Sequence, residues 1–294
     1  MSQFSQPDHR EAQDLQTIKT RSEYPLNSQT GMPGQSGSTQ FQFTNDPYSD
    51  LPVIGTGMTG IVLDMVDGRV VKKAKKYQPG QLDDPDDLEY MNEINQQTLE
   101  NETQIFKRLG SHKGIIPYFQ TSQYGVELAR AEEDLESYLA TNAEPKNSLK
   151  IGWILGLTET FTYIHSHKVL VDDIALRNIL VLDDQLKLAD FGQSILLPLD
   201  IDMASANDNG LDVRIEILHL GWILYSIATW QIHKYYFFGP ENPDCCWPEP
   251  DSFPDVDGIL FGKIIKKCWR RAYASIDHVN DEAHQVRLAT GHTL

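Results

Sequence analysis

Residues 171–192 read VDDIALRNILVLDDQLKLADFG and place three oxygen-bearing side chains along an otherwise apolar hairpin. Asn178 follows Asp173 by five positions, and Asp190 follows Asn178 by twelve. Two such side chains that converge can hold Mg²⁺ against phosphate oxygens, while a third carboxylate can accept a hydroxyl proton. An Asx-rich loop before a hairpin explains any one of them, but not all three in this order. The spacing therefore indicates phosphoryl-transfer chemistry.

Upstream, the stretch IGTGMTGIV carries Gly55, Gly57 and Gly60 between two β-branched runs, with Val62 just beyond. Glycines at this spacing let backbone N–H groups approach phosphate oxygens without interference from a Cβ, and Val62 would lie over a base. A glycine-bearing hairpin that is only a turn explains the stretch about equally well. A strand rather than a helix is expected after the glycines, which argues against a dinucleotide-binding fold.

Lys72 ends the next apolar run, RVVKKA, and Glu102 lies in a stretch with helical spacing of apolar residues. We expect Glu102 to reach back and pair with Lys72, with Lys73 as the alternative lysine. Taken singly, Lys72 is more simply interpreted as an edge-strand lysine and Glu102 as a solvated helix residue. Only their joint occurrence with the downstream aspartates favours a site.

The pattern of β-branched runs followed by helical periodicity predicts an α+β arrangement of two lobes, a small antiparallel β lobe with one helix and then a mainly helical lobe. A β-meander is expected from Leu51, because two β-branched runs are joined by Asp-Gly. The other expected elements are a helix over 88–109, two strands within 114–130, a helix over 148–167, short strands over 179–189, and helices within 212–231 and 256–290.

Composition sets the expected domain limits and partners. Residues 1–47 are rich in Gln, Ser, Gly and Pro, which predicts a disordered tail, and the folded domain is expected over 48–290, with an N-lobe of about 48–131 and a C-lobe of about 132–290. The formal charge of −17 disfavours nucleic acid or an anionic membrane as partner. We find no signal peptide or transmembrane segment and no disulfide framework, so we expect an intracellular protein, cytoplasmic or nuclear.

Together these motifs resemble the eukaryotic protein kinase domain, from about Leu51 to about Arg287. The glycine loop, VVK, the helix glutamate, DIALRN and DFG occur in that family's order. HLGWILYSIATW resembles the long helix at the centre of the family's C-lobe, and IIKKCWRRAY resembles its late helix with a Cys-Trp pair. IEIL before HLG, with the same Cys-Trp pair, also resembles divergent kinase-like proteins of filamentous fungi.

The resemblance implies a bilobal protein-kinase-like fold and an ATP-dependent protein kinase that acts on a protein substrate with ATP and Mg²⁺ as cofactors. Gly55, Gly57, Gly60 and Val62 would cover the nucleotide. Lys72 would hold its phosphates and Glu102 would fix Lys72. Asn178 and Asp190 would bind Mg²⁺, and Asp173 would accept the proton of the attacking hydroxyl. The residues expected at the adenine are Leu128, Ala129, Arg130 and Ala131.

The acceptor residue stays open between Ser/Thr and Tyr. Arg177 follows Asp173 by four positions, as an arginine does in tyrosine kinases, while Ala175 stands where serine/threonine kinases usually carry a lysine. The likeness of DIALRN to the tyrosine-kinase sequence DLAARN rests on few residues.

Three departures from the family pattern keep two other functions open. Val171 and Asp172 replace its His-Arg, so we expect no control by phosphorylation of the activation loop. Residues 190–216 contain no Ala-Pro-Glu and offer only Ser194 and Ser205 as hydroxyls, and Glu216 replaces an aspartate, for which Asp212 could substitute. The alternatives are a pseudokinase that binds nucleotide or a partner, and a small-molecule phosphotransferase like the aminoglycoside and choline kinases, against which the complete glycine loop argues.

Overall fold

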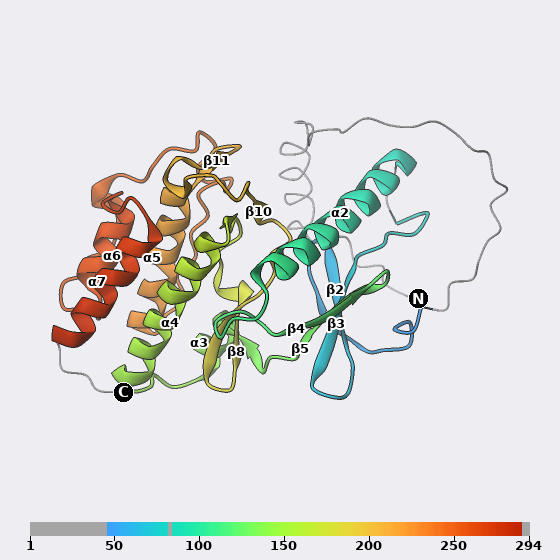
Figure 1. The fold of residues 1–294 in the computed structure, drawn as a ribbon, viewed down its shortest axis with the longest axis horizontal. Coiled ribbons are helices and arrows are strands. Elements are labelled where there is room, and N and C mark those ends of the chain that lie inside the picture. The colour runs from blue at the N-terminus through green and yellow to red at the C-terminus, as the bar shows by residue number, and fades with distance from the viewer. Residues whose placement is uncertain (1–45, 82–83, 290–294) are drawn as a thin grey trace, which may run out of the picture.

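The computed structural model describes residues 46–81 and 84–289 (Figure 1). The predicted disordered tail, residues 1–47, lies outside the described residues apart from its last two. Asp46, one of these two residues, forms an ion pair with Lys73. Two positions further along, the hydroxyl of Tyr48 donates to Glu127 at 2.7 Å. The chain is therefore attached to the first sheet from Asp46 onward.

The N-terminal part is a five-stranded antiparallel sheet with strand order β1-β2-β3-β5-β4. Its strands are β1 (Val53–Thr56), β2 (Gly60–Asp64), β3 (Arg69–Ala74), β4 (Tyr118–Ser122) and β5 (Gly125–Ala129). The predicted meander and the two later strands are thus present. The turn around Asp67 and Gly68 joins β2 to β3, and Gly68 has a φ of 77°, which glycine adopts without steric cost.

Helix α2 (Pro85–Leu109) crosses this sheet and begins three residues before the predicted start (Figure 1). Asp84 caps it, because its side chain accepts from the backbone N–H of Asp86, and Pro85 suits a first turn in which its missing N–H costs nothing. The helix ends at Leu109 and is followed by the capping residue Gly110, which has a φ of 62°. These local signals fix where α2 starts and therefore which turn carries Glu102.

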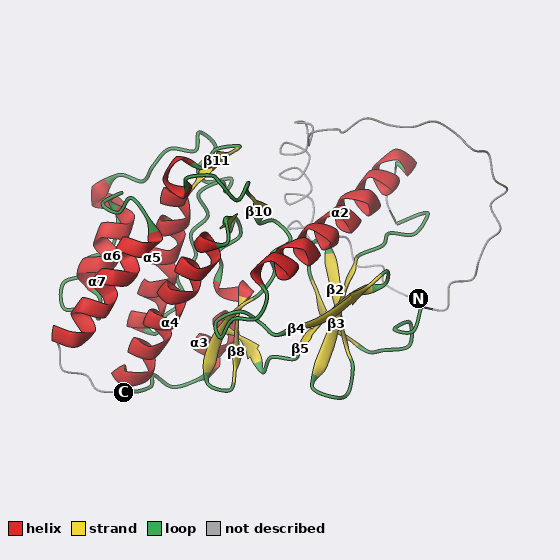
Figure 2. Cartoon of the chain, in the orientation of Figure 1, coloured by secondary structure: helices red, strands yellow, loops and turns green. Residues whose placement is uncertain are grey.

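The C-terminal part is mainly helical, as predicted (Figure 2). Its helices are α3 (Leu135–Thr141), α4 (Asn147–Ser166), α5 (Val213–Thr229), α6 (Gly262–Trp269) and α7 (Ile276–Ala289), with short 3-10 turns η1 (Leu176–Asn178), η2 (Met203–Ser205) and η3 (Pro250–Ser252). Three small antiparallel sheets join β6 (Glu133–Asp134) to β8 (Ile179–Leu182) and β9 (Gln185–Leu188), β7 (Val169–Leu170) to β10 (Ile195–Leu196), and β11 (Asn207–Asp208) to β12 (Leu211–Asp212).

The helical region predicted over 256–290 is interrupted, which corrects that prediction. Residues 256–261 form turns before α6, and residues 270–275 separate α6 from α7. Phe261 and Arg271 both have a φ of 55°. A left-handed residue ends the run of right-handed helical dihedrals, so one amphipathic stretch becomes two short helices.

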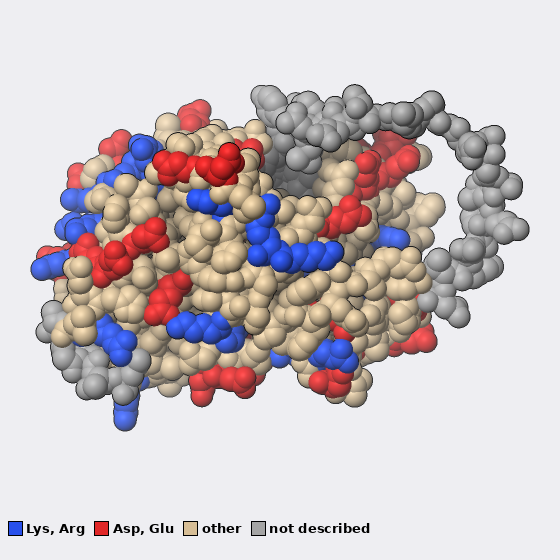
Figure 3. All heavy atoms as spheres, in the orientation of Figure 1, with Lys and Arg blue, Asp and Glu red and all other residues tan. Residues whose placement is uncertain are grey.

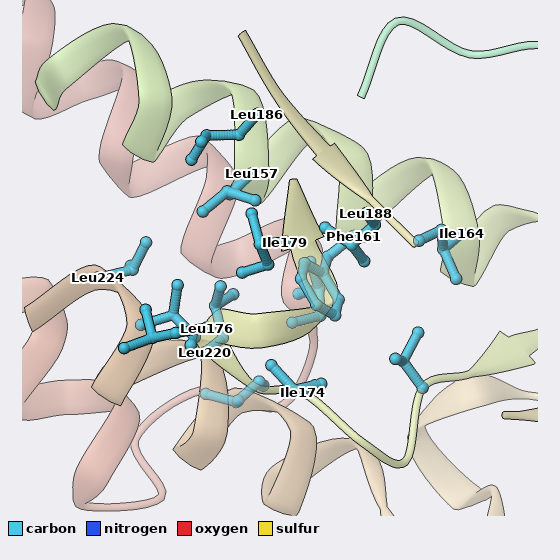
Figure 4. Close-up of a cluster of buried hydrophobic side chains, with 14 of the residues drawn as sticks. Leu157, Phe161, Ile164, Ile174, Leu176, Ile179, Leu186, Leu188, Leu220 and Leu224 are labelled. Atoms are coloured by element: carbon cyan, nitrogen blue, oxygen red, sulfur yellow. The ribbon is translucent and has the colours of Figure 1, made fainter. Parts of the chain in front are cut away.

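The core beneath the site joins α4 and α5 to the hairpin β8–β9. Figure 4 shows side chains from these elements converging, among them Leu157, Phe161, Ile179, Leu188 and Leu220, and all five are at most 3 % exposed. Full burial of such side chains contributes about 1.5–3 kcal/mol each. The segment 173–190 is thus carried on a rigid base.

A second packed region joins α5 to α6. The Trp222 and Trp269 rings lie 4.6 Å apart between centroids, and Phe253 stacks on Trp269 at 5.1 Å. Gly221 lets α6 approach, because a Cβ there would lie 2.8 Å from Cβ of Cys268 and 3.0 Å from the Trp269 ring. The absence of a side chain at Gly221 therefore sets the distance between the two helices.

Acidic and basic side chains are interspersed on the face shown in Figure 3. None of the helices over residues 46–81 and 84–289 is both long and apolar enough to cross a bilayer.

Candidate functional site

The glycine hairpin lies over the side chain of the β3 lysine. The N–H of Gly57 donates to the carbonyl of Gly60 at 2.8 Å and closes the turn between β1 and β2. A Cβ at Gly60 would lie 3.3 Å from Cε of Lys72. Gly55 is paired with Val62 and Val62 with Lys72 across the sheet. Gly55, Gly60, Val62 and Lys72 therefore converge on one surface, with Gly57 at the turn.

Lys72 forms ion pairs with two carboxylates at the junction of the two lobes. Its Nζ lies 2.7 Å from Oε2 of Glu102, on α2, and 2.7 Å from Oδ1 of Asp190, in the C-terminal part. Glu102 is fully buried, while the Asp190 side chain is 48 % exposed. The expected pair of Lys72 with Glu102 is present, and Lys73 is instead paired with Asp46.

These contacts determine the charges of the group. Burial alone would lower the pKa of Lys72, but Glu102 and Asp190 outweigh it and hold that pKa above its usual range. Burial would raise the pKa of Asp190, yet Lys72 holds it below its usual range. At neutral pH the site thus presents an ammonium group and an ionised Asp190.

The residues after Asp190 fix it against α2. The N–H of Phe191 donates to Oε1 of Glu102 at 3.1 Å, and Asn101 donates to the carbonyls of Gly192 and Ser194 at 2.9 and 2.7 Å. The Phe191 ring is fully buried and meets Phe106 edge-on, with centroids 5.4 Å apart. One turn of α2 therefore positions both Lys72 and the loop that bears Asp190.

Asp173 is held by its own loop. NH2 of Arg177 donates to both carboxylate oxygens, at 2.8 and 2.7 Å, and Nδ2 of Asn178 donates to Oδ2 at 2.8 Å and to the Asp173 carbonyl at 2.9 Å. The Asn178 carbonyl accepts from the N–H of Ala189 at 2.9 Å, which ties this loop to the segment before Asp190. The structure thus brings Asp173, Arg177 and Asn178 into one cluster beside Asp190.

Glu216, which stands in place of an aspartate in the resembled family, is hydrogen-bonded to the start of the loop that bears Asp173. Its Oε1 accepts from the N–H of Val171 at 2.6 Å, and its Oε2 lies 2.9 Å from Nε2 of His165. Asp212, the proposed substitute, caps α5 by accepting from Arg214 and Ile215 N–H groups. The longer glutamate reaches the loop that bears Asp173 without help from Asp212.

The segment expected at the adenine comprises the last two residues of β5 and the two residues after it. Leu128 is buried and Ala129 N–H donates to the Pro117 carbonyl at 2.9 Å. The N–H of Arg130 donates to Gly68 and its side chain is paired with Asp64. Ala131 packs against the core beyond it. Leu128, Ala129 and Ala131 thus lie where the two lobes connect, whereas the Arg130 side chain is ion-paired with Asp64 of β2.

The donor set suits Mg²⁺. Asp190 supplies a carboxylate, and because Nδ2 of Asn178 is used on Asp173, its amide oxygen remains as a ligand. Among the residues that the structure describes, no group of three or more His, Cys, Asp or Glu could hold a metal ion by itself. Mg²⁺ ordinarily takes one or two protein oxygens together with water and phosphate oxygens, so two ligands fit it.

Sequence reasoning missed three residues of this region. His165 contacts Glu216 from 51 positions away, Asn101 holds Gly192 from 91 away, and Tyr236 bonds to Arg177 from 59 away. No local pattern signals such contacts. The run YYFF at 235–238 is the single hint for Tyr236, since adjacent aromatic residues in a loop cannot all be buried.

Comparison with known proteins agrees with this geometry. The family model described as protein kinase domain matches residues 48–207, more than half of the chain. Mitogen-activated protein kinase kinase kinase 12 of Rattus norvegicus is 25 % identical over 160 residues, which cover 48 % of this chain and 18 % of that protein. A putative serine/threonine-protein kinase of Acanthamoeba polyphaga mimivirus is 27 % identical over 176 residues, 53 % of this chain and 30 % of that protein. The matched segment thus spans less than a third of either relative.

Proposed function

This chain belongs to the protein kinase domain family, and we propose that it transfers the γ-phosphoryl group of Mg-ATP to a hydroxyl of a protein substrate. The observation that carries the proposal is the ion-paired group of Lys72, Glu102 and Asp190, with both contacts of Lys72 at 2.7 Å. An ammonium that is largely shielded from water and kept charged by two carboxylates is suited to phosphate oxygens. A purely structural ion pair would not need the half-exposed second carboxylate.

Each residue has a defined part in the proposed reaction. Gly55, Gly57 and Gly60 would let the backbone of the hairpin approach the phosphates beside Lys72 without a Cβ in the way, and Leu128, Ala129 and Ala131 would contact the base. Asp190 and the amide oxygen of Asn178 would hold Mg²⁺. Once bound, the ion would neutralise charge on the phosphate oxygens.

Asp173 would accept the proton of the attacking hydroxyl, and Arg177 would orient it. A carboxylate offers about four lone-pair directions. Three of these on Asp173 already accept bonds from Arg177 and Asn178. The remaining direction is available for the substrate hydroxyl, so the acceptor is positioned before substrate arrives.

Phosphate transfer from labelled ATP to a generic protein substrate tests the proposal. Asp173→Asn should lower transfer by about 10²–10⁴-fold, as loss of a general base does, without loss of nucleotide binding. Lys72→Met should lower both transfer and binding. Lys73→Met is the matched control, because that lysine is paired with Asp46 outside the site, and it should retain both.

Thermal unfolding with Mg-ATP separates binding from transfer. At a concentration near 100 times the dissociation constant, nucleotide should stabilise wild type by about 2.7 kcal/mol. Transfer at the wild-type rate in Asp173→Asn would overturn the assignment of Asp173.

A pseudokinase is the second candidate, favoured by Val171 and Asp172 in place of His-Arg. Its expected result is stabilisation by Mg-ATP in wild type with no transfer to any acceptor, including the protein itself. Valine in place of the family's histidine still holds the start of the loop that bears Asp173, since Val171 is buried and its N–H donates to Glu216.

A further inference from the structure

Arg177 joins the Asp173 carboxylate to a phenol that the proposed reaction has not used. While its NH2 donates to Asp173, its NH1 donates to the hydroxyl of Tyr236 at 2.8 Å. The guanidinium carbon also lies 5.6 Å from the centroid of the Tyr236 ring. A single guanidinium group therefore separates the Tyr236 hydroxyl from the expected proton acceptor.

The segment that presents Tyr236 is anchored on both sides. Tyr235 stacks on Trp222, with centroids 5.6 Å apart and planes 15° apart, and the N–H of Phe237 donates to Nε2 of His219 at 3.1 Å. Phe237 itself is buried. Tyr236 between them is 46 % exposed. Its backbone is thus fixed next to Arg177, while its side chain has room to turn.

We propose that Tyr236 is a phosphoryl acceptor of this chain's own site, modified within the same molecule; the inference rests on the proposed kinase activity. The phenolic oxygen would form a bond to the γ-phosphorus of ATP as the bond from that phosphorus to the β,γ-bridging oxygen breaks. ADP leaves with the electron pair of that bond, and the phenolic proton passes to Asp173. The hydroxyl bonds to Arg177 before nucleotide binds, and such contacts commonly rearrange in the reactive complex.

Charge and access favour Tyr236 over neighbouring hydroxyls. Against the effect of burial, the pKa of Asp190 is lowered by Lys72, then by the N–H of Gly192 and then by Arg177, so the charge of Arg177 acts on Asp190 as well as on Asp173. Ser194 is buried, and the hydroxyl of Ser205 donates to the Asp202 carbonyl. The product phosphate would add further negative charge beside Arg177, a favourable pairing.

Phosphosite mapping of the full chain tests the inference. Purified protein, freed of phosphate with a phosphatase, is incubated with Mg-ATP and its peptides are analysed by mass spectrometry. Phosphate is expected on Tyr236, with a rate constant that does not change on dilution, because donor site and acceptor belong to one molecule. Tyr236→Phe should abolish this modification and Asp173→Asn should slow it by about 10²–10⁴-fold, whereas the matched variant Tyr235→Phe should retain it.

The outcomes distinguish the inference from the function on which it rests. Transfer to a generic substrate or to other residues, with Tyr236 unmodified, overturns the inference and leaves the kinase proposal standing. Modification of Tyr236 that slows on dilution overturns transfer within one molecule. Absence of transfer to any acceptor overturns both.

A second measurement does not depend on transfer. With fluorotyrosine placed at 236, the ¹⁹F resonance should shift when Mg²⁺ and a non-hydrolysable ATP analogue bind, because a γ-phosphate would draw Arg177 and the phenol into new contacts. Fluorotyrosine at 235 serves as the matched control and should shift less. An unchanged resonance at 236 in protein that the analogue stabilises would contradict the inference.

Discussion

At the scale of single residues, Glu216 connects helix α5 to the start of the loop that bears Asp173. It is fully buried and meets the N–H of Val171 at 2.6 Å and Nε2 of His165 at 2.9 Å. A buried polar group that loses its partner costs about 1–3 kcal/mol, more than a made hydrogen bond contributes. The position of Asp173, two residues after Val171, therefore depends on the length of this side chain.

Glu216→Asp should lower the free energy of unfolding by about 1–3 kcal/mol, because the shorter carboxylate cannot reach both partners. Urea unfolding followed by circular dichroism measures this change. The same substitution at exposed Glu249 is the control and should have little effect. Wild-type stability of Glu216→Asp would show that the family's aspartate serves equally well here.

His219 makes the free energy of unfolding depend on pH in the mildly acidic range. Burial lowers its pKa from 6.5 to about 4, and its Nε2 must stay unprotonated to accept from Phe237. Protons therefore bind the unfolded chain more readily. The contribution of neutral His219 to the free energy of unfolding is therefore fully present above pH 6.5. It is lost as the pH decreases from 6.5 to about 4, and the loss amounts to about 3 kcal/mol.

Replacing His219 by Gln tests this assignment, since an amide oxygen can accept from Phe237 but does not titrate. The free energy of unfolding, measured by urea titration across the same pH range, should fall less steeply in His219→Gln than in wild type. Equal slopes in the two proteins would assign the acid sensitivity to other groups.

At the scale of elements, α5 and α6 approach so closely at Gly221 that glycine is favoured over alanine there, the reverse of the usual preference in a helix interior. Alanine in place of glycine usually stabilises a helix interior by up to about 1 kcal/mol. At Gly221 the added Cβ would lie 2.8 Å from Cβ of Cys268 and force the helices apart, at a cost of about 1–3 kcal/mol. Gly156 in α4 is the matched control, because a Cβ there meets nothing within 4 Å.

Gly221→Ala should therefore destabilise the protein and Gly156→Ala should stabilise it, in the same unfolding assay. The opposite signs separate packing from helix propensity. A stabilising Gly221→Ala would mean that α6 can move away without loss.

The elements that sequence predicts well are those with local signals. The β-meander follows from its β-branched runs and Asp-Gly turn, and α2 and α4 follow from apolar periodicity. The interruption at 270–275 escapes prediction because IIKKCWRRAY continues the helical pattern through Arg271, whose φ of 55° ends it. Trp269 and Tyr273, on the two sides of Arg271, are both buried, a tertiary arrangement that carries no local pattern. The contacts of Tyr236 and His165 escape for the same reason, since partners more than fifty positions away carry no local pattern.

At the scale of the whole molecule, the lobes meet where the Asp190–Gly192 turn lies against α2. A Cβ at Gly192 would lie 2.5 Å from Cγ2 of Thr98. Gly192→Ala should push this turn from α2, weaken the contact of Phe191 N–H with Glu102 and lower Mg-ATP binding. Thermal stabilisation by Mg-ATP measures the loss.

Thr98→Ser provides the rescue that identifies the cause. Serine lacks Cγ2 but keeps the hydroxyl that donates to Ile94 in the same helix. The double variant should recover nucleotide binding, whereas Thr98→Ser alone should resemble wild type. A double variant no better than Gly192→Ala would point to backbone effects at Gly192 instead of contact with Thr98.

The distribution of the large aromatic rings has a consequence for experiments on the intact chain. All five tryptophans, among them the Trp222 and Trp269 pair between α5 and α6, lie beyond residue 150. Intrinsic indole emission therefore reports on the helical half, and loosening of the N-terminal five-stranded sheet alone would leave this emission unchanged. Emission and backbone circular dichroism recorded together would reveal whether the two halves melt as one cooperative unit.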